Sequence, residues 1–135
     1  MAFVHNGLSA APAAGWDAVE SSVTLAGGLS PEILADLSDF SHLIVVFWLD
    51  QLPEDRPRPT RISVDGAVRG VLATRSQLRP SPIGVSVVSL LGIDGTTLRV
   101  RSLDALDGTP VLDVKPYIPY YDSVQSASVP AWVYA

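Results

Sequence analysis

The sequence predicts an all-β fold with one short helix, arranged as a single antiparallel β-barrel-like domain. Short stretches in which apolar residues alternate or dominate are separated by turn residues at close intervals, which is typical of barrels and sandwiches. The alternating strands and helices that a parallel sheet needs are missing from the pattern. The 135 residues fit one domain. We expect its core at about residues 16–122 and a C-terminal tail at 123–135.

The first predicted elements are a strand and a short helix. Trp16–Leu25 alternates between apolar and polar residues and is expected to be a half-buried strand. Ser30-Pro31-Glu32 is a helix start, with a capping hydroxyl, a proline at the first position and an acid near the positive end of the helix dipole. Ile33, Leu34 and Leu37 are expected to face the core.

The middle of the chain predicts a central strand, a loop and a further strand. Phe40–Leu49 is apolar on both faces and rich in Val, Ile and Phe, which favours a buried strand over a buried helix. Leu52–Arg61 contains three prolines and mixed charges, so we expect a loop. Arg69–Thr74 is expected to be a strand.

The last predicted strands form a hairpin and one edge. Val85–Ile93 and Thr97–Leu103 flank Asp94-Gly95, and an Asp-Gly pair between apolar runs favours a type I′ turn. Val111–Val114 is expected to be a short final strand after a turn at Asp107-Gly108. The tail ends in SVPAWVYA, which we expect to pack on the body of the protein or on a partner subunit.

Composition excludes several classes of protein. A net charge of −5 does not suit a protein that grips a long stretch of nucleic acid. The longest apolar run, Leu43–Leu49, is too short to span a bilayer, and no secretion signal is evident, so we expect a cytoplasmic protein without a membrane partner. Cysteine is absent, and His5 and His42 lack ligand-type spacing, so no metal site is expected. Nucleotide-binding glycine motifs and a hydrolase elbow are also absent.

One segment dense in functional residue types is Ala73–Gly84, ATRSQLRPSPIG. Its two prolines fix their own φ and push the preceding residues toward extended geometry, and Gly84 permits close approach of another group to the backbone. The result is a stiff loop presenting Arg75 and Arg79, whose guanidinium groups suit a carboxylate or phosphate. An ordinary proline-rich turn with solvated arginines is the alternative.

A second such segment is Asp107–Asp122, DGTPVLDVKPYIPYYD. Asp113 and Lys115 are two residues apart on a predicted strand, so they share a face and can pair. The tyrosines in the segment add aromatic faces that attract cations. A structural salt bridge at a strand end closed by prolines explains the same residues.

His42 lies in FSH at the start of the central strand. A lone histidine on a buried strand is more often a satisfied core residue than a catalyst. A histidine also suits a general base, and both interpretations remain open.

Together these segments resemble the TrmO/TsaA-like family over about residues 16–122. The resemblance rests on FSHLIVVFWL, GVLATRSQLRPSPIGVSVVSLLGIDG and LDALDGTPVLDVKPYIPYYD, in this order and spacing. It implies a single antiparallel barrel-like domain, a homodimer, and binding of S-adenosylmethionine without a Rossmann fold. It further implies methylation of N6 of a modified adenosine in tRNA.

Site residues follow from the resemblance. It implies that S-adenosylmethionine contacts Phe40, Ser41, His42, Arg75, Ser76, Arg79, Pro80, Ser81, Pro82, Ile83, Leu112, Asp113, Lys115 and Tyr117. We expect Arg79 or Arg75 to hold the methionine carboxylate, with backbone carbonyls, Asp113 or a tyrosine face near the sulfonium. His42 is the first choice for a general base and Asp122 the second.

Two departures from the family pattern concern the acceptor. Ser81 replaces the Asn of R-P-N-P-I-G, and from the short stretch after the core we expect no room for the further C-terminal domain of longer members. Three functions therefore remain open: a tRNA methyltransferase, a small-molecule methyltransferase, and a non-catalytic module that binds the cofactor.

Overall fold

The computed structural model describes residues 1–134, which form two compact units. The barrel unit comprises Met1–Gln51 and Ile83–Tyr117. The second unit comprises Leu52–Pro82 and the described residues from Ile118 onward. Each unit is described by itself below.

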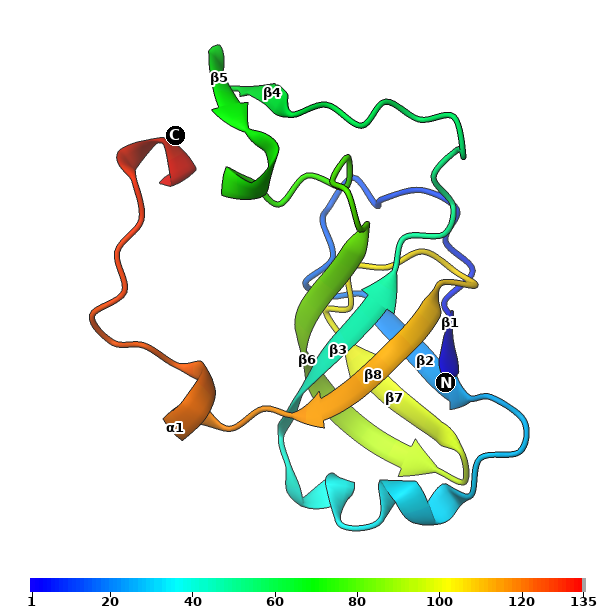
Figure 1. Cartoon of the computed structure of the whole chain (residues 1–135). Helices are drawn as coiled ribbons and strands as arrows, with labels where there is room; N and C mark the ends of the chain where they lie inside the picture. Colours follow the sequence, from blue (N-terminus) through cyan, green and yellow to red (C-terminus); the bar gives the residue numbers. More distant parts are fainter. Residues whose placement is uncertain (135) are drawn as a thin grey trace. The chain divides into compact units, whose positions relative to one another are not determined.

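The barrel unit is a closed antiparallel barrel, which confirms the predicted fold class. Its strands follow one another around the barrel in the order β1-β2-β7-β6-β3-β8 (Figure 1). Pairing of Ala2 with Val111 and of Phe3 with Pro110 joins β1 to β8 and closes the barrel. The strands are β1 (Ala2–His5), β2 (Glu20–Leu25), β3 (His42–Trp48), β6 (Ile83–Asp94), β7 (Thr97–Arg101) and β8 (Pro110–Pro116).

The core fills the barrel because alternate residues of each strand point inward. On β3, Leu43, Val45 and Phe47 are buried, while the residues between them face outward. Phe47 lies against Gly84 of the neighbouring strand, where a Cβ atom would lie 2.2 Å from the Phe47 ring. The group that closely approaches the Gly84 backbone, as the sequence predicts, is therefore the side chain of the core residue Phe47. Other fully buried residues of the barrel unit include Ala2, Val4, Val23, Val88, Leu98, Val100, Leu103 and Val111.

Two short 3-10 segments, η1 (Pro31–Leu34) and η2 (Leu37–Asp39), replace the predicted short helix. The Ser30 hydroxyl accepts a hydrogen bond from the Glu32 backbone N–H at 3.2 Å, as expected of a cap. Leu34 is buried in the core, but Ile33 is 56% exposed, so its predicted inward orientation is wrong. Asp36 has a left-handed φ of 66°, which ends the helical conformation after the single turn of η1. This explains why only some of the three apolar residues expected to face inward reach the core.

The hairpin between β6 and β7 is confirmed, but its turn differs in type from the prediction. Asp94 pairs with Thr97, so Gly95 and Thr96 are the loop residues. Gly95 has φ +60°, whereas Thr96 is not among the residues with positive φ. A positive φ at the first loop residue alone fits a type II′ turn.

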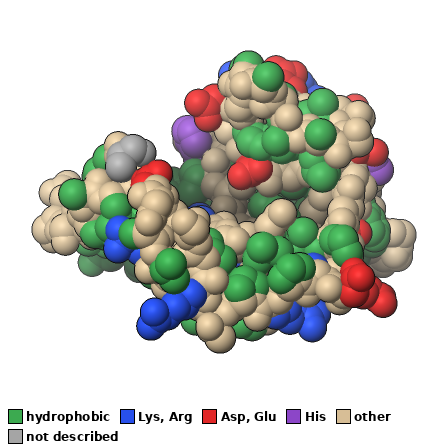
Figure 2. Space-filling view, turned by 90° about the horizontal axis from the view of Figure 1, so that it is seen from above, with side chains coloured by type: hydrophobic (Ala, Val, Ile, Leu, Met, Phe, Trp, Pro, Cys, Tyr) green, Lys and Arg blue, Asp and Glu red, His purple; other side chains and the backbone are tan. Residues whose placement is uncertain are grey.

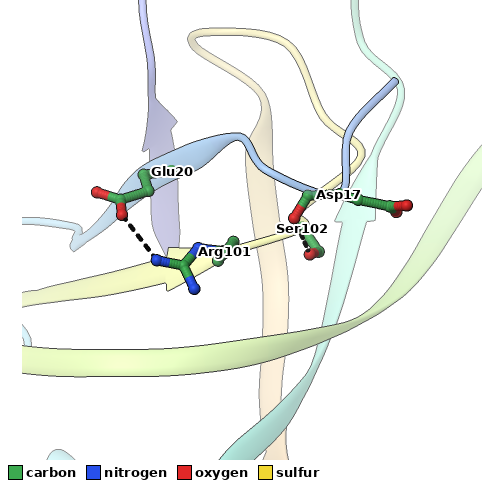
Figure 3. A network of polar contacts seen from close by, with 4 residues as sticks. All are labelled: Asp17, Glu20, Arg101 and Ser102. Carbon is green, nitrogen blue, oxygen red and sulfur yellow. Dashed lines mark hydrogen bonds and ion pairs between the residues drawn. The ribbon is translucent and has the colours of Figure 1, made fainter. Parts of the chain in front are cut away.

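The N-terminal part of the barrel departs most from the expectation. The strand β1 was not predicted, and the predicted strand from Trp16 begins only at Glu20. Ser102 holds the residues before β2. Its hydroxyl donates to the Asp17 carbonyl at 2.7 Å (Figure 3). Its N–H donates to the Val19 carbonyl at 3.0 Å. Beside it, Arg101 pairs with Glu20 at 3.0 Å and links β7 to β2.

The second unit contains a hairpin of β4 (Arg61–Val64) and β5 (Ala67–Gly70), followed by η3 (Val71–Ala73). The predicted strand at 69–74 is therefore largely wrong, and β4 was missed. Asp65 and Gly66 both have positive φ, at 50° and 76°, as a type I′ turn requires. The chain continues from Ile118 through α1 (Pro119–Asp122) to η4 (Ala131–Tyr134).

The tail contacts the hairpin of the second unit. The Arg69 guanidinium lies 4.6 Å from the centre of the Trp132 ring, within the range of a cation–π interaction. In the part of the chain that the structure describes, no helix is long and apolar enough to cross a membrane.

Candidate functional site

The outward side chains of β6, β3 and β8 form one surface, which we call the outer face. These three strands are neighbours in the barrel and lie side by side in Figure 1. Their register aligns the outward residues in rows across the strands. The rows are Ser89 with His42, then Val87 with Ile44 and Lys115, then Val85 with Val46 and Asp113, then Ile83 with Trp48.

A β-bulge in β8 turns two successive side chains to the outer face. Val46 pairs with Asp113, but the next residue of β3, Phe47, pairs with Val111, so Leu112 is the extra residue. Val111 is buried inside the barrel, whereas Leu112 is 46% exposed. Bulges re-aim side chains in this way and are common next to functional sites. Leu112 and Asp113, both predicted cofactor contacts, therefore emerge on the same side.

Asp113 and Lys115 form the pair that their spacing predicts. Lys115 Nζ lies 2.8 Å from Asp113 Oδ2, and Asp113 Oδ1 accepts a hydrogen bond from the Val114 N–H at 2.9 Å. The hydrogen bond and the charge of Asp113 raise the pKa of Lys115 above 10.5. Both side chains are about half exposed, and exposed pairs add little to stability. The ion pair between Asp113 and Lys115 is therefore expected to contribute little to the stability of the fold.

His42 is exposed, so it is not a satisfied core histidine. Its Nδ1 lies 2.7 Å from the Ser41 hydroxyl, and its Nε2 lies 3.5 Å from the Ser89 hydroxyl. The Tyr117 ring approaches its edge at a centroid distance of 6.4 Å. The Tyr117 N–H donates to the His42 carbonyl at 3.0 Å and so extends the ladder between β3 and β8 by one residue. Phe40, at the entry to the strand, is 37% exposed.

The arginine-bearing loop of the second unit is held by its own polar groups. Arg79 Nη1 donates to the carbonyls of Thr74 (2.9 Å) and Ser76 (3.1 Å). The Thr74 hydroxyl accepts from the Ser76 N–H, and the Ser76 hydroxyl accepts from the Leu78 N–H. The stiffness predicted from the prolines thus has a second source, since one nitrogen of Arg79 is engaged inside the loop. Arg75 and Ser81 are exposed.

Asp122 caps the turn in which it lies. Its Oδ2 accepts a hydrogen bond from the Ile118 N–H at 2.8 Å. Within the same turn, the rings of Tyr120 and Tyr121 meet edge to face at 5.3 Å and are 88% and 73% exposed. One carboxylate oxygen of Asp122 is therefore committed to the backbone.

The barrel unit brings together only part of the predicted site. His42, Ile83, Leu112, Asp113, Lys115 and Tyr117 lie on or beside the outer face, and Ser41 contacts His42. Residues 75–82 and Asp122 belong to the second unit. Ser89 could not be predicted as a site residue. It is the one polar residue in an outward series of apolar residues on β6, but its partner His42 follows from a strand register that the sequence does not reveal. Within residues 1–134, no cluster of three or more His, Asp or Glu side chains has the geometry of a metal site.

Charge is divided unequally between the two units. The second unit has six arginines and four acidic residues, a net charge of +2. The barrel unit has Lys115, two arginines and ten acidic residues, a net charge of −7, which together give the −5 of the chain. On the face displayed in Figure 2, the basic side chains form small separate groups.

Comparison with known families and proteins shows a match over most of the chain. Residues 6–123 match the family described as the tRNA-methyltransferase O N-terminal domain. A protein of Archaeoglobus fulgidus, named a probable S-adenosyl-L-methionine-binding protein, is 49% identical over 96 residues, covering 71% of this chain and 26% of that protein. The tRNA (adenine(37)-N6)-methyltransferase of Escherichia coli K12 is 46% identical over 100 residues, covering 68% of this chain and 42% of that protein.

Solved structures agree with the match. A crystal structure of TrmO from Pseudomonas aeruginosa superimposes with a TM-score of 0.74 at 30% identity, covering 94% of this chain and 58% of that one. The chain thus spans a quarter to somewhat over half of the length of these relatives.

Proposed function

The chain belongs to the tRNA-methyltransferase O N-terminal domain family, and from this premise we propose that it binds S-adenosylmethionine and transfers its methyl group to an acceptor nitrogen. The observation that carries the proposal is the outer face, where the FSH and D-x-K-P-Y segments meet across β3 and β8. Relatives named for S-adenosylmethionine binding or methyl transfer support the same chemistry.

The residues of the outer face fit such a ligand chemically. S-adenosylmethionine has a flat base, a sulfonium cation and a carboxylate, and when bound it supplies an activated methyl group. Leu112, which is exposed on the same face, offers apolar surface for the base. The Asp113 carboxylate and the face of Tyr117 suit the cation. In the second unit, the family resemblance implies Arg75 or Arg79 for the carboxylate: Arg75 is exposed, and the nitrogens of Arg79 other than Nη1 are left for a ligand.

The protein contributes mainly alignment and a proton acceptor, because the donor carries the driving force for methyl transfer. We assign the proton acceptor to His42, which is exposed on the outer face. Asp122 is the weaker candidate because Oδ2 already accepts a backbone hydrogen bond. Phe40 and Ser41 at the start of β3, the loop from Ser76 to Ile83, and Leu112 complete the proposed set of cofactor contacts.

We propose a modified adenosine of tRNA as the acceptor. Relatives of Escherichia coli and mouse that are named tRNA (adenine(37)-N6)-methyltransferase support this class. Six of the eight arginines lie in residues 52–82, where they can neutralise phosphates although the whole chain is acidic. A small-molecule acceptor remains the second candidate, favoured by Ser81 in place of the family asparagine.

We further propose that the protein acts as a homodimer in the cytoplasm. The apolar side chains of β6 on the outer face, Ile83, Val85 and Val87, are 40%, 48% and 49% exposed. A contiguous apolar strip of this kind suits a second copy of the chain. Light scattering coupled to size exclusion should give twice the monomer mass, and Val85→Glu should reduce it to the mass of one chain.

The deciding experiment uses methyl-labelled S-adenosylmethionine with either bulk tRNA or a metabolite extract. Label in tRNA supports the proposed acceptor, and label only in small molecules overturns it. Binding of the cofactor without transfer to either fraction would overturn the proposed activity and leave a cofactor-binding module.

A further inference from the structure

Both ring nitrogens of His42 face serine hydroxyls. The Ser41 hydroxyl lies 2.7 Å from Nδ1, and the Ser89 hydroxyl lies 3.5 Å from Nε2. Ser89 is the residue directly opposite His42 in the antiparallel ladder of β3 and β6. Side chains opposite each other in such a ladder are close enough to interact. The contact with Ser89 is therefore a consequence of the strand register.

The backbone holds these residues in place on both sides of β3. The Leu90 N–H donates to the Ser41 carbonyl at 2.9 Å, which attaches Ser41 to β6. The Tyr117 N–H donates to the His42 carbonyl at 3.0 Å, which attaches His42 to the end of β8. The imidazole thus lies between the hydroxyls of Ser41 and Ser89, and both serines are held in the barrel by backbone hydrogen bonds.

A hydroxyl differs from most other partners of a ring nitrogen because it can both donate and accept a hydrogen bond. A carbonyl or carboxylate only accepts, so it requires an N–H on the ring. A hydroxyl can donate to the bare nitrogen of the neutral ring and can accept from the N–H of the charged ring. Two hydroxyls can therefore keep the imidazole in one orientation before and after it gains a proton.

We propose that Ser89 is a positioning residue that, together with Ser41, orients His42 as the proton acceptor of methyl transfer. The chemical part rests on the proposed function. A bond forms between the acceptor nitrogen and the methyl carbon, the electron pair of the broken C–S bond stays on sulfur, and the proton of the acceptor nitrogen moves to His42 Nε2. The contact from Ser89 is the longer of the two, which leaves Nε2 the more accessible nitrogen. Once Nε2 carries the proton, the Ser89 oxygen accepts a hydrogen bond from it.

The test compares Ser89→Thr with Ser89→Val. These side chains have the same shape and both favour strands, but only threonine keeps the hydroxyl. Nuclear Overhauser contacts between the His42 ring protons and Tyr117 report the ring orientation at about pH 5 and about pH 8, which bracket the charge change of histidine. We expect the threonine variant to keep the wild-type contacts at both pH values and the valine variant to lose them.

Turnover gives a second readout. We expect Ser89→Val to lower kcat about tenfold relative to Ser89→Thr, with the KM for the cofactor unchanged, because only a step in the reaction is affected. Ser86→Val is the control, because it is the same substitution on the same strand but at a hydroxyl that accepts a hydrogen bond from the Asp104 N–H at 3.4 Å and does not contact His42. Equal ring contacts in the valine and threonine variants would overturn the role of Ser89. Because the contacts need no turnover, a failure of methyl transfer in the wild type would be recognised separately.

Discussion

Replacing Gly84 with alanine tests how the R-P-x-P-I-G segment is joined to the barrel core. The new Cβ atom would lie 2.2 Å from Phe47 Cε2 and 2.4 Å from Cζ. The Phe47 ring is 3% exposed and is surrounded by the core, so it cannot swing into solvent. Either β6 must shift away from β3 or the ring must leave its rotamer.

The expected cost follows from these contacts. Overpacking of a filled core costs about 1–3 kcal/mol. Alanine is better than glycine in a strand interior by about 0.5–1 kcal/mol, which offsets a part. We therefore expect Gly84→Ala to lower the free energy of unfolding by about 1–2 kcal/mol and the melting temperature by roughly 4–8 °C. Urea denaturation followed by circular dichroism measures the first quantity, and calorimetry the second.

Gly92→Ala is the matched control. There the nearest atom to a new Cβ is Arg99 Nη2 at 2.6 Å, the far end of a flexible side chain that can move away. We expect its stability to stay within about 0.5 kcal/mol of the wild type.

A double-mutant cycle identifies the partner of Gly84. Phe47→Leu removes the ring atoms nearest to the new methyl group, so the double variant should be more stable than the sum of the single changes predicts, by about 1 kcal/mol. Wild-type stability of Gly84→Ala, or strict additivity with Phe47→Leu, would refute the argument that this glycine is required by the core.

Three further predictions concern polar groups. Backbone N–H groups of residues 7 and 6 lower the pKa of Asp107 below 3.8, so its contribution to stability is present above pH 3.8 and is lost as the pH falls through the folded-state pKa. Denaturation curves should give a higher free energy of unfolding for wild type than for Asp107→Asn at neutral pH, and this difference should become smaller in acid. A difference that stays constant with pH would contradict the prediction. Calorimetry should show weaker S-adenosylmethionine binding for Arg79→Ala, and affinity equal to wild type would remove Arg79 from the site and leave Arg75. Glu20→Ala should cost less than about 1 kcal/mol, because its pair with Arg101 is exposed; a larger loss in urea titrations would show that the pair in Figure 3 is structural.

Features that depend on neighbouring residues were predictable from the sequence. The alternating strands, the cap at Ser30, the turn at Gly95 and the pairing of Asp113 with Lys115 all follow from local geometry, and the structure contains each of them. The family resemblance also depends on local motifs in order. The hairpin at Asp65-Gly66 had a local signal as well, but the proline-rich stretch before it concealed the four-residue strands on either side.

Long-range features were decided by tertiary structure. Closure of the barrel by β1 and the bulge at Leu112 depend on which strands become neighbours and in what register. The meeting of His42 with Ser89 depends on the same register, across 47 residues of sequence. Strand alternation tells which face a side chain takes but does not tell what lies opposite it, because register is set by packing of the whole core. The sequence by itself therefore determined the fold class and the candidate residues, while the folded barrel decided which of them share a surface.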